Sequence, residues 1–337
     1  MKKLFPLFAC AALVAHLPLS AQEAKPAPAP SEIVAAAKTE EWVTIAPSDL
    51  LVMDLAPDAK GKPRRVVLQL MPALFSQGWT GNIRKLAAAE FWDGTSINRV
   101  QDNYVVQWGD ATEKKALPEG LAVVPESDYE TAQECGEMAL GYPGCNEEPR
   151  VVSPWKLNVQ SPYGGVEGFW KGWPLVKNSQ PLALPKKATS FDQKAKLATV
   201  WPTHCYGMVG VGRNLSPDTG TGAELYTVIG HAPRHLDRNI AIVGRIIEGM
   251  EHLSSLPRGT GALGFYEKEE ERVPILSVRL GNEALDAATF EYLSTESASF
   301  AKYADARANR RDPFFIKPAG GADICNIPVP VRRKAVK

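Results

Sequence analysis

The 337-residue sequence has no excess of charge of either sign. Its 38 Lys and Arg residues balance 38 Asp and Glu residues, so the formal net charge at pH 7 is zero. A protein that binds nucleic acid or an anionic membrane surface by electrostatics carries a basic patch or a basic overall composition. The composition therefore argues against both as partners.

The sequence also lacks an uninterrupted apolar run of the length that a membrane-spanning helix needs. Residues 4–19 are largely apolar, but Pro6 and Pro18 interrupt them, and the run falls short of the roughly 20 residues required. Lys2 and Lys3 precede this run, and small residues follow it. This order is typical of a secretory signal peptide.

We therefore expect the chain to be exported. The predicted signal peptide is residues 1–21, with cleavage after Ala21, and the mature protein is expected in the periplasm or secreted. Cys10 gives the apolar run a faint likeness to a lipoprotein signal, which stays open as a minor alternative.

Cysteine is scarce, with five in the whole chain and four after the predicted cleavage. An even number in an oxidising compartment indicates disulfides rather than free thiols. Four cysteines allow three pairings. We favour a local bond between Cys135 and Cys145 across a Tyr-Pro-Gly turn, and a second bond between Cys205 and Cys325 that ties the C-terminal region to the core.

Motifs for metal, cofactor or nucleophilic chemistry are weak. His231 and His235 are four residues apart, but Pro233 argues against the helix that would align them, and no third ligand is indicated. The sequence at 210–212, Gly-Val-Gly, lacks the third glycine of a dinucleotide fingerprint. We expect neither a metal nor a cofactor.

Glycine, proline and short alternating apolar runs are abundant, with 27 residues each of Gly and Pro. This composition favours a turn-rich β protein. The clearest stretch is 91–112, FWDGTSINRVQDNYVVQWGDAT, where turn formers separate short strand-like runs. Arg99 and Gln107 are polar residues inside these runs, so each either faces solvent or serves a purpose.

The segment DGTSINRVQDNYVVQWGD resembles the signature of the cyclophilin-type peptidyl-prolyl isomerases, which runs roughly DGtxFHRvixxFmiQgGD. The order of elements before it is also similar to that family. We predict a strand at 64–70 and a helix at 76–90, after a possible leading strand within 41–54.

A second segment, residues 205–250, resembles the later half of a cyclophilin. Its best matches are Met208, Gly222, the Leu236-Asp237 pair, Gly244-Arg245 and the Glu-Gly-Met at 248–250. A second helix is predicted at 248–256 and a closing strand at 273–280.

The resemblance implies a mainly β fold: a closed antiparallel eight-stranded β-barrel capped by two helices. We expect a Pro/Ala-rich tether at 22–45, the cyclophilin-like domain at 46–282 and a C-terminal extension at 283–337 with a helix at 299–311. We interpret residues 113–202 as a large, loop-rich insertion in the domain, and we expect its tryptophans to serve more as core than as a peptide-binding surface. A monomer is favoured.

By the same resemblance, the chain is a peptidyl-prolyl cis-trans isomerase that assists the folding of exported proteins, and its partners are proline-containing polypeptides. Arg99 takes the catalytic place and Gln107 orients the substrate or Arg99. The implied substrate-binding residues are Tyr104, Val105, Val209, Gly210, Glu224, Tyr226, His235 and Leu236.

Several positions depart from the family pattern. Tyr226 stands where the family usually has Phe, Glu224 where it has Gln, and Val209-Gly210 where an Ala-Asn pair binds the peptide backbone. The Glu224 carboxylate is expected to pair with Arg99 and compete with substrate. The alternative function is therefore a catalytically weak or inactive cyclophilin-like module that binds peptides or acts as a chaperone.

Overall fold

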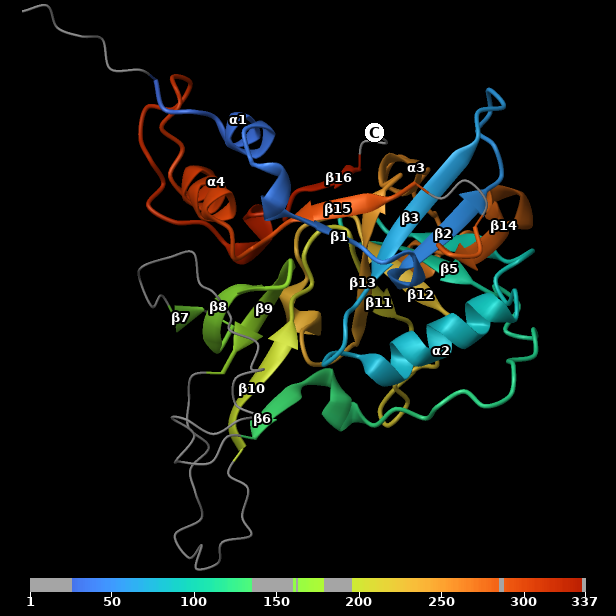
Figure 1. Cartoon of the computed structure of the whole chain (residues 1–337). Helices are drawn as coiled ribbons and strands as arrows, with labels where there is room; N and C mark the ends of the chain where they lie inside the picture. The colour runs from blue at the N-terminus through green and yellow to red at the C-terminus, as the bar shows by residue number, and fades with distance from the viewer. Residues whose placement is uncertain (1–25, 135–159, 162, 179–195, 285–287, 335–337) are drawn as a thin grey trace, which may run out of the picture.

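Eight antiparallel strands close into a barrel in the computed structural model, which describes residues 26–134, 160–161, 163–178, 196–284 and 288–334 (Figure 1). Around the barrel the strands follow the order β11-β12-β5-β4-β14-β2-β3-β13. Their bounds are β2 Leu50–Leu55, β3 Arg64–Leu70, β4 Ser96–Val100, β5 Val105–Gly109, β11 Met208–Val211, β12 Leu225–Val228, β13 Ile242–Glu248 and β14 Val273–Leu280. The predicted closed eight-stranded barrel is confirmed.

Strand β3 shows why the barrel is covered on its outer side. Side chains alternate between the two faces of a strand, so Val66 and Leu68 enter the barrel core while Val67 faces outward. Val67 is nevertheless buried, because Phe290 and Tyr292 of the C-terminal extension pack against it. The barrel therefore carries a second apolar layer on this side.

Two helices cover the barrel core, as predicted. Helix α2, Gln77–Ala88, buries one apolar face against the core, and α3, Glu251–Ser254, adds Leu253. The prediction of a helix at 248–256 is wrong in its bounds. Strand β13 continues to Glu248, and Gly249 follows with a φ of +81°, so the helix begins only after this turn.

The insertion is built around a sheet of its own rather than around loops alone. Its five strands pair in the order β6-β10-β9-β8-β7. Their bounds are β6 Thr131–Glu134, β7 Gln160–Ser161, β8 Gly165–Trp170, β9 Trp173–Lys177 and β10 Lys196–Pro202. Trp170 and Trp173 are buried against Met71 and Ile242 of the barrel region, so both serve as core.

The C-terminal extension forms a third sheet together with the N-terminal region. Strands β15, Phe290–Leu293, and β16, Val331–Arg333, pair with β1, Trp42–Thr44, in the order β1-β15-β16. Helix α4, Ala298–Ala308, begins one residue before the predicted 299 and ends three residues before the predicted 311. Ser297 caps it by accepting a hydrogen bond from the Phe300 backbone at 3.0 Å.

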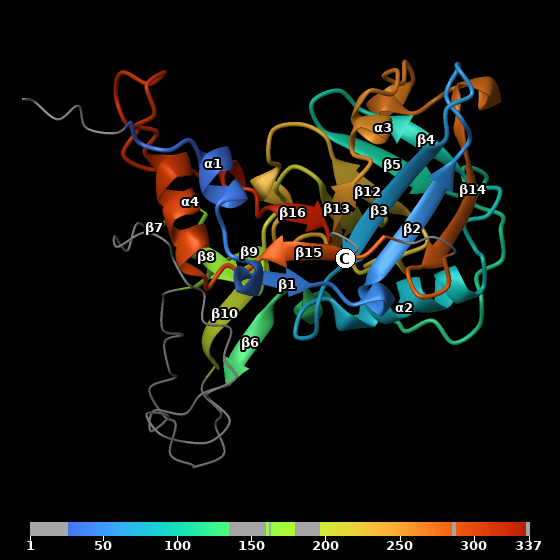
Figure 2. The same ribbon diagram turned by 45° about the horizontal axis from the view of Figure 1, so that its top comes forward.

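The predicted extended tether at 22–45 contains ordered elements from residue 30 onward. Helix α1, Pro30–Ala35, lies beside α4 in both views (Figures 1 and 2). Pro30 fits the first helical turn, and Ile33 and Val34 pack against the apolar cluster around α4. The tether prediction is therefore corrected: this region packs on the extension.

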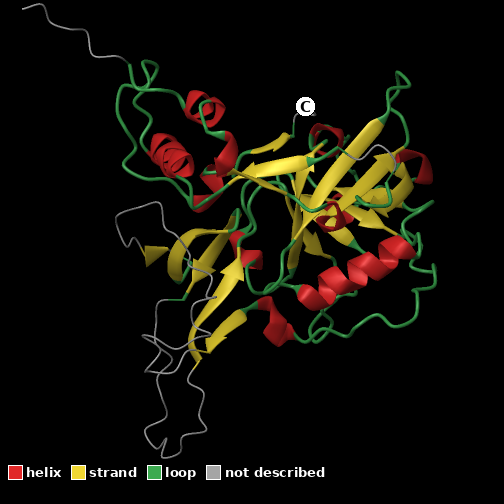
Figure 3. Ribbon diagram, in the orientation of Figure 1, coloured by secondary structure: helices red, strands yellow, loops and turns green. Residues whose placement is uncertain are grey.

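Short 3-10 helices complete the described structure, in which strands prevail over helices (Figure 3). Their bounds are η1 Thr39–Glu41, η2 Pro47–Asp49, η3 Glu126–Tyr129, η5 Arg234–Leu236, η6 Ala262–Gly264, η7 Glu269–Glu271 and η8 Ile324–Asn326. Within the described ranges, no helix has the length and apolar character to cross a membrane.

Candidate active site

Three predicted residues meet in one row across neighbouring strands of the barrel. Gln107 on β5 lies opposite Arg99 on β4 and, on its other side, opposite Tyr226 on β12. All three line a cavity of about 690 Å³. The register of the sheet thus places a cation, an amide and an aromatic ring on one wall.

The cavity has an apolar side next to this row. Val105 and Tyr226 form a buried cluster with Val228, against which Tyr104, Leu236 and Ile240 pack. All of these except Val228 line the cavity. This side offers the apolar surface that a proline ring requires.

Arg99 is held from several directions. Its Nη1 donates a hydrogen bond to Gln107 Oε1 at 3.1 Å, and its Nε donates to the Leu263 carbonyl at 2.8 Å. The Phe265 ring lies 5.3 Å from the guanidinium carbon. Partial burial lowers the pKa of Arg99, but an arginine so placed remains charged at neutral pH. A fixed positive charge therefore faces the cavity.

Glu224 lies at the far side of Gln107 from Arg99. Gln107 Nε2 donates to Glu224 Oε2 at 3.4 Å, so the expected direct pair between Glu224 and Arg99 is replaced by a bridge through Gln107. Burial raises the pKa of Glu224 to about 7, although hydrogen bonds from Gln107 and Asn98 oppose this shift. The carboxyl group therefore changes charge close to physiological pH.

Three predicted substrate-binding residues lie outside the lining of the cavity. Val209 is fully buried in the barrel core. Gly210 lies opposite Tyr226 on the neighbouring strand, and a Cβ there would come within 2.3 Å of the Tyr226 hydroxyl. His235 stacks on Tyr104, with ring centroids 6.3 Å apart. Val209 and Gly210 therefore lie behind the wall of the cavity, whereas His235 is exposed and packs beside it.

Leu263 and Phe265 line the cavity although the sequence did not predict them. They belong to the loop around η6, which lies next to β4, where Phe265 forms an isolated β-bridge with Arg99, and this loop has no motif of its own. His204, which contacts the Tyr226 hydroxyl from behind, belongs to no matched motif and was missed as a site residue. Its partner Asp237 belongs to the matched Leu236-Asp237 pair but was not predicted to have a role in the site. A buried histidine is not marked in a sequence by any periodic pattern.

The two predicted disulfides have different outcomes. Cys205 and Cys325 are joined by a disulfide, as predicted, whereas Cys135 and Cys145 lie outside the described residues. Among the described residues, no group of three His, Cys, Asp or Glu side chains is arranged to hold a metal ion.

Comparison with a solved structure supports the fold. The structure is similar to the cyclophilin AquaCyp293 from Hirschia baltica, with a TM-score of 0.62 and 19% identity over 88% of this chain and 95% of that one. A cyclophilin-type isomerase structure from Cryptosporidium parvum overlaps more weakly, with a TM-score of 0.35 and 11% identity over 68% of this chain and 98% of that one. That overlap is too low to add to the argument.

Comparison with curated proteins gave no match. The family model described as "Cyclophilin type peptidyl-prolyl cis-trans isomerase/CLD" matches residues 65–280, which is more than half of the chain. The matched range lies within the predicted domain at 46–282 and includes every predicted catalytic and substrate-binding residue. The chain therefore belongs to the cyclophilin-type peptidyl-prolyl cis-trans isomerase family.

Proposed function

We propose that this protein isomerises Xaa-Pro bonds in exported polypeptides, with Arg99 as the catalytic residue. The observation that carries the proposal is the row of Arg99, Gln107 and Tyr226, which face one cavity from adjacent strands. This row combines a fixed cation with an apolar surface.

Rotation about the prolyl bond is slow because resonance gives the C–N bond partial double-bond character, with a barrier of roughly 18–20 kcal/mol. The twisted transition state loses this resonance. A donor that reaches the prolyl nitrogen or the twisted carbonyl lowers the barrier, above all where water is excluded. Arg99 carries several donors in a rigid plane and keeps its charge, which suits it to this role.

Gln107 has two tasks in this proposal. Its Oε1 accepts from Arg99 at 3.1 Å, which fixes the plane of the guanidinium. Its Nε2 donates toward Glu224, which fixes the amide in that orientation. The proline ring would rest on Val105, Tyr226 and Leu236. The reaction needs no nucleophile, metal or cofactor.

Export of the protein is part of the proposal. The signal-like sequence at 1–21 supports it, and the disulfide between Cys205 and Cys325 suits an oxidising compartment. The periplasm offers both the oxidising conditions and newly exported chains whose folding waits on prolyl isomerisation.

The test is a protease-coupled isomerisation assay with an Ala-Pro tetrapeptide, on the oxidised protein. We expect acceleration by the wild type and a loss of most of it in Arg99→Ala. Arg84→Ala is the matched control, because Arg84 is a surface arginine that pairs with Asp49 away from the cavity. Peptide binding without turnover, unchanged in Arg99→Ala, would instead favour the non-catalytic binding module.

A further inference from the structure

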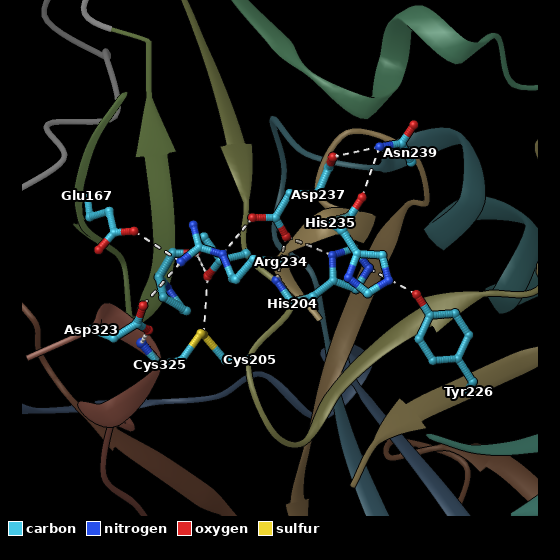
Figure 4. Close-up of polar contacts among 12 residues, drawn as sticks. Glu167, His204, Cys205, Tyr226, Arg234, His235, Asp237, Asn239, Asp323 and Cys325 are labelled. Atoms are coloured by element: carbon cyan, nitrogen blue, oxygen red, sulfur yellow. Dashed lines mark hydrogen bonds and ion pairs between the residues drawn. A yellow bond between two sulfur atoms is a disulfide. The ribbon is translucent and has the colours of Figure 1, made fainter. Parts of the chain in front are cut away.

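The hydroxyl of Tyr226 has a buried partner behind the wall of the cavity. It lies 2.9 Å from His204 Nε2, and the two rings are close to parallel, with centroids 6.4 Å apart (Figure 4). The exposed fractions of Tyr226 and His204 are 5% and 1%. The polar end of Tyr226 is thus satisfied inside the protein while its ring lines the cavity.

The direction of this hydrogen bond follows from the other side of the imidazole. His204 Nδ1 lies 2.9 Å from Asp237 Oδ1, and a carboxylate oxygen accepts, so Nδ1 carries the proton. Burial lowers the pKa of His204, which keeps the ring neutral. Nε2 is then an acceptor, and the Tyr226 hydroxyl donates to it.

Asp237 is itself fixed by two further donors. Its Oδ1 also accepts from the His204 backbone at 2.9 Å, and its Oδ2 accepts from Arg234 Nε at 2.7 Å. Arg234 Nη1 in turn donates to Glu167 at 3.0 Å and lies 3.8 Å from Asp323. Glu167 belongs to the insertion and Asp323 to the C-terminal extension, so both additions to the barrel hold this network (Figure 4).

Gly210 leaves the space that the Tyr226 ring and hydroxyl occupy when the hydroxyl bonds to His204. A Cβ at this position would lie 2.3 Å from the Tyr226 hydroxyl oxygen and 2.7 Å from ring carbon Cε1. The tyrosine, the glycine opposite it and the buried histidine therefore depend on one another. Together they account for two departures from the family pattern, Tyr226 in place of Phe and Gly210 in place of Asn.

We infer that His204 is a positioning residue of the prolyl cavity: by accepting a hydrogen bond from the Tyr226 hydroxyl, it holds the tyrosine ring in place with its polar end turned away from the substrate. The inference rests on the proposed function of the cavity. Without His204 the buried hydroxyl has no partner, and it gains one only by turning toward the water of the cavity. The apolar wall would then be both displaced and hydrated.

A double-mutant cycle tests this inference. His204→Leu is measured in the wild-type background and in a Tyr226→Phe background, which has no hydroxyl to satisfy. In the wild-type background we expect His204→Leu to weaken the Kd for an Ala-Pro peptide and to lower kcat/KM by about ten-fold. In the Tyr226→Phe background we expect both losses to stay below about two-fold. Tyr303→Phe is the control, because it removes another buried tyrosine hydrogen bond, to the Pro328 carbonyl, far from the cavity.

A second variant keeps the test decisive if His204→Leu does not fold. In His204→Asn the amide nitrogen replaces Nδ1 and keeps the bond to Asp237, but the side chain is too short to reach Tyr226. His204→Asn should therefore weaken peptide binding and lower kcat/KM when Tyr226 is present, and have little effect in the Tyr226→Phe background.

The two proposals fail in different ways. If His204→Leu lowers peptide affinity and kcat/KM equally in both backgrounds, or in neither, the positioning role of His204 is overturned. Turnover by the wild type would still support the isomerase. A wild type that binds the peptide without turning it over would overturn the isomerase, and the cycle in Kd would still decide the role of His204. A wild type that neither binds nor turns over peptide would overturn both.

Discussion

Gln107 separates Glu224 from Arg99: it donates to the carboxylate at 3.4 Å while it accepts from the guanidinium at 3.1 Å. One side-chain amide therefore lies between the carboxylate of Glu224 and the guanidinium of Arg99 and contacts both. In the family pattern described above, an uncharged glutamine usually stands in place of Glu224. The acidic residue gives this cavity a titratable group near Arg99, the residue that we propose to be catalytic.

Activity should depend on pH through Glu224. Burial raises the pKa of Glu224 to about 7, so the carboxyl group is mostly neutral below that pH and mostly charged above it. In the proposed mechanism the positive potential of Arg99 stabilises the transition state, and a negative charge near Arg99 weakens that potential. We expect kcat/KM of the wild type to fall several-fold between about pH 6 and pH 8, and Glu224→Gln to show a flat profile. An equal fall in Glu224→Gln would assign the titration to another group.

The same residue should affect stability with a defined sign. Because the carboxyl binds its proton more tightly in the folded state than in the unfolded state, the folded chain carries more protons between about pH 4.5 and 7. The free energy of unfolding therefore falls as pH rises through this window. Urea unfolding across this window measures the difference in the free energy of unfolding between Glu224→Gln and the wild type. As pH rises, the stability of the variant relative to the wild type should increase. A difference that stays constant across the window would contradict this assignment.

Gly210→Ala should disturb the wall of the cavity. The added Cβ meets the Tyr226 ring and hydroxyl at less than 3 Å, and overpacking of this kind costs about 1–3 kcal/mol of stability. We expect a lower melting temperature together with a several-fold weaker peptide Kd. Gly81→Ala is the control, since a Cβ there meets nothing within 4 Å and alanine favours the helix. Loss of stability in Gly81→Ala alone would contradict the packing argument.

Removal of the disulfide should lower stability. The bond joins residues 120 apart, so it closes a long loop in the unfolded chain. Loss of such a closure reduces the free energy of unfolding by roughly 3–5 kcal/mol in the chain-entropy description. Guanidinium unfolding of Cys205→Ser/Cys325→Ser beside the oxidised wild type measures this, and coincident unfolding midpoints would contradict it.

Phe265→Ala should impair catalysis without unfolding the barrel. The Phe265 ring lies 5.3 Å from the Arg99 guanidinium carbon, and a cation–π contact at a partly exposed site contributes about 0.5–1 kcal/mol. We expect a two- to five-fold loss of kcat/KM, roughly the range that this energy allows. Phe314→Ala, at an exposed ring in the C-terminal extension, should leave the rate unchanged. Equal rates for Phe265→Ala and the wild type would show that the ring does not support Arg99.

Local sequence patterns predicted much of the barrel. The strands at 64–70 and 273–280 were predicted with the bounds that β3 and β14 have, because their apolar content and flanking turns are strong local signals. Helix α1 was missed, because a six-residue helix is stable only when it packs on another element, here α4. The helix therefore depends on contacts between residues 30–35 and residues 298–308, which lie near opposite ends of the chain.

The predicted residues that line the cavity all belong to matched motifs, although Val209, Gly210 and His235 of the second motif lie outside its lining. Arg99 and Gln107 belong to one continuous segment, and Tyr226 to a second, so the family pattern places all three in one cavity. The bridge through Gln107 and the His204 network depend on cross-strand register and on the packing of the insertion and the extension. Those long-range relationships leave no local pattern in the sequence.

The measurement that tests the account most directly is the kcat/KM of Arg99→Ala and Arg99→Lys against the wild type, with the peptide Kd measured in parallel. The account predicts at least about a hundred-fold loss in Arg99→Ala, a smaller loss in Arg99→Lys, and Kd values within a few-fold of the wild type. Arg99→Ala with wild-type kcat/KM, or with a loss explained entirely by a weaker Kd, would contradict Arg99 as the catalytic residue.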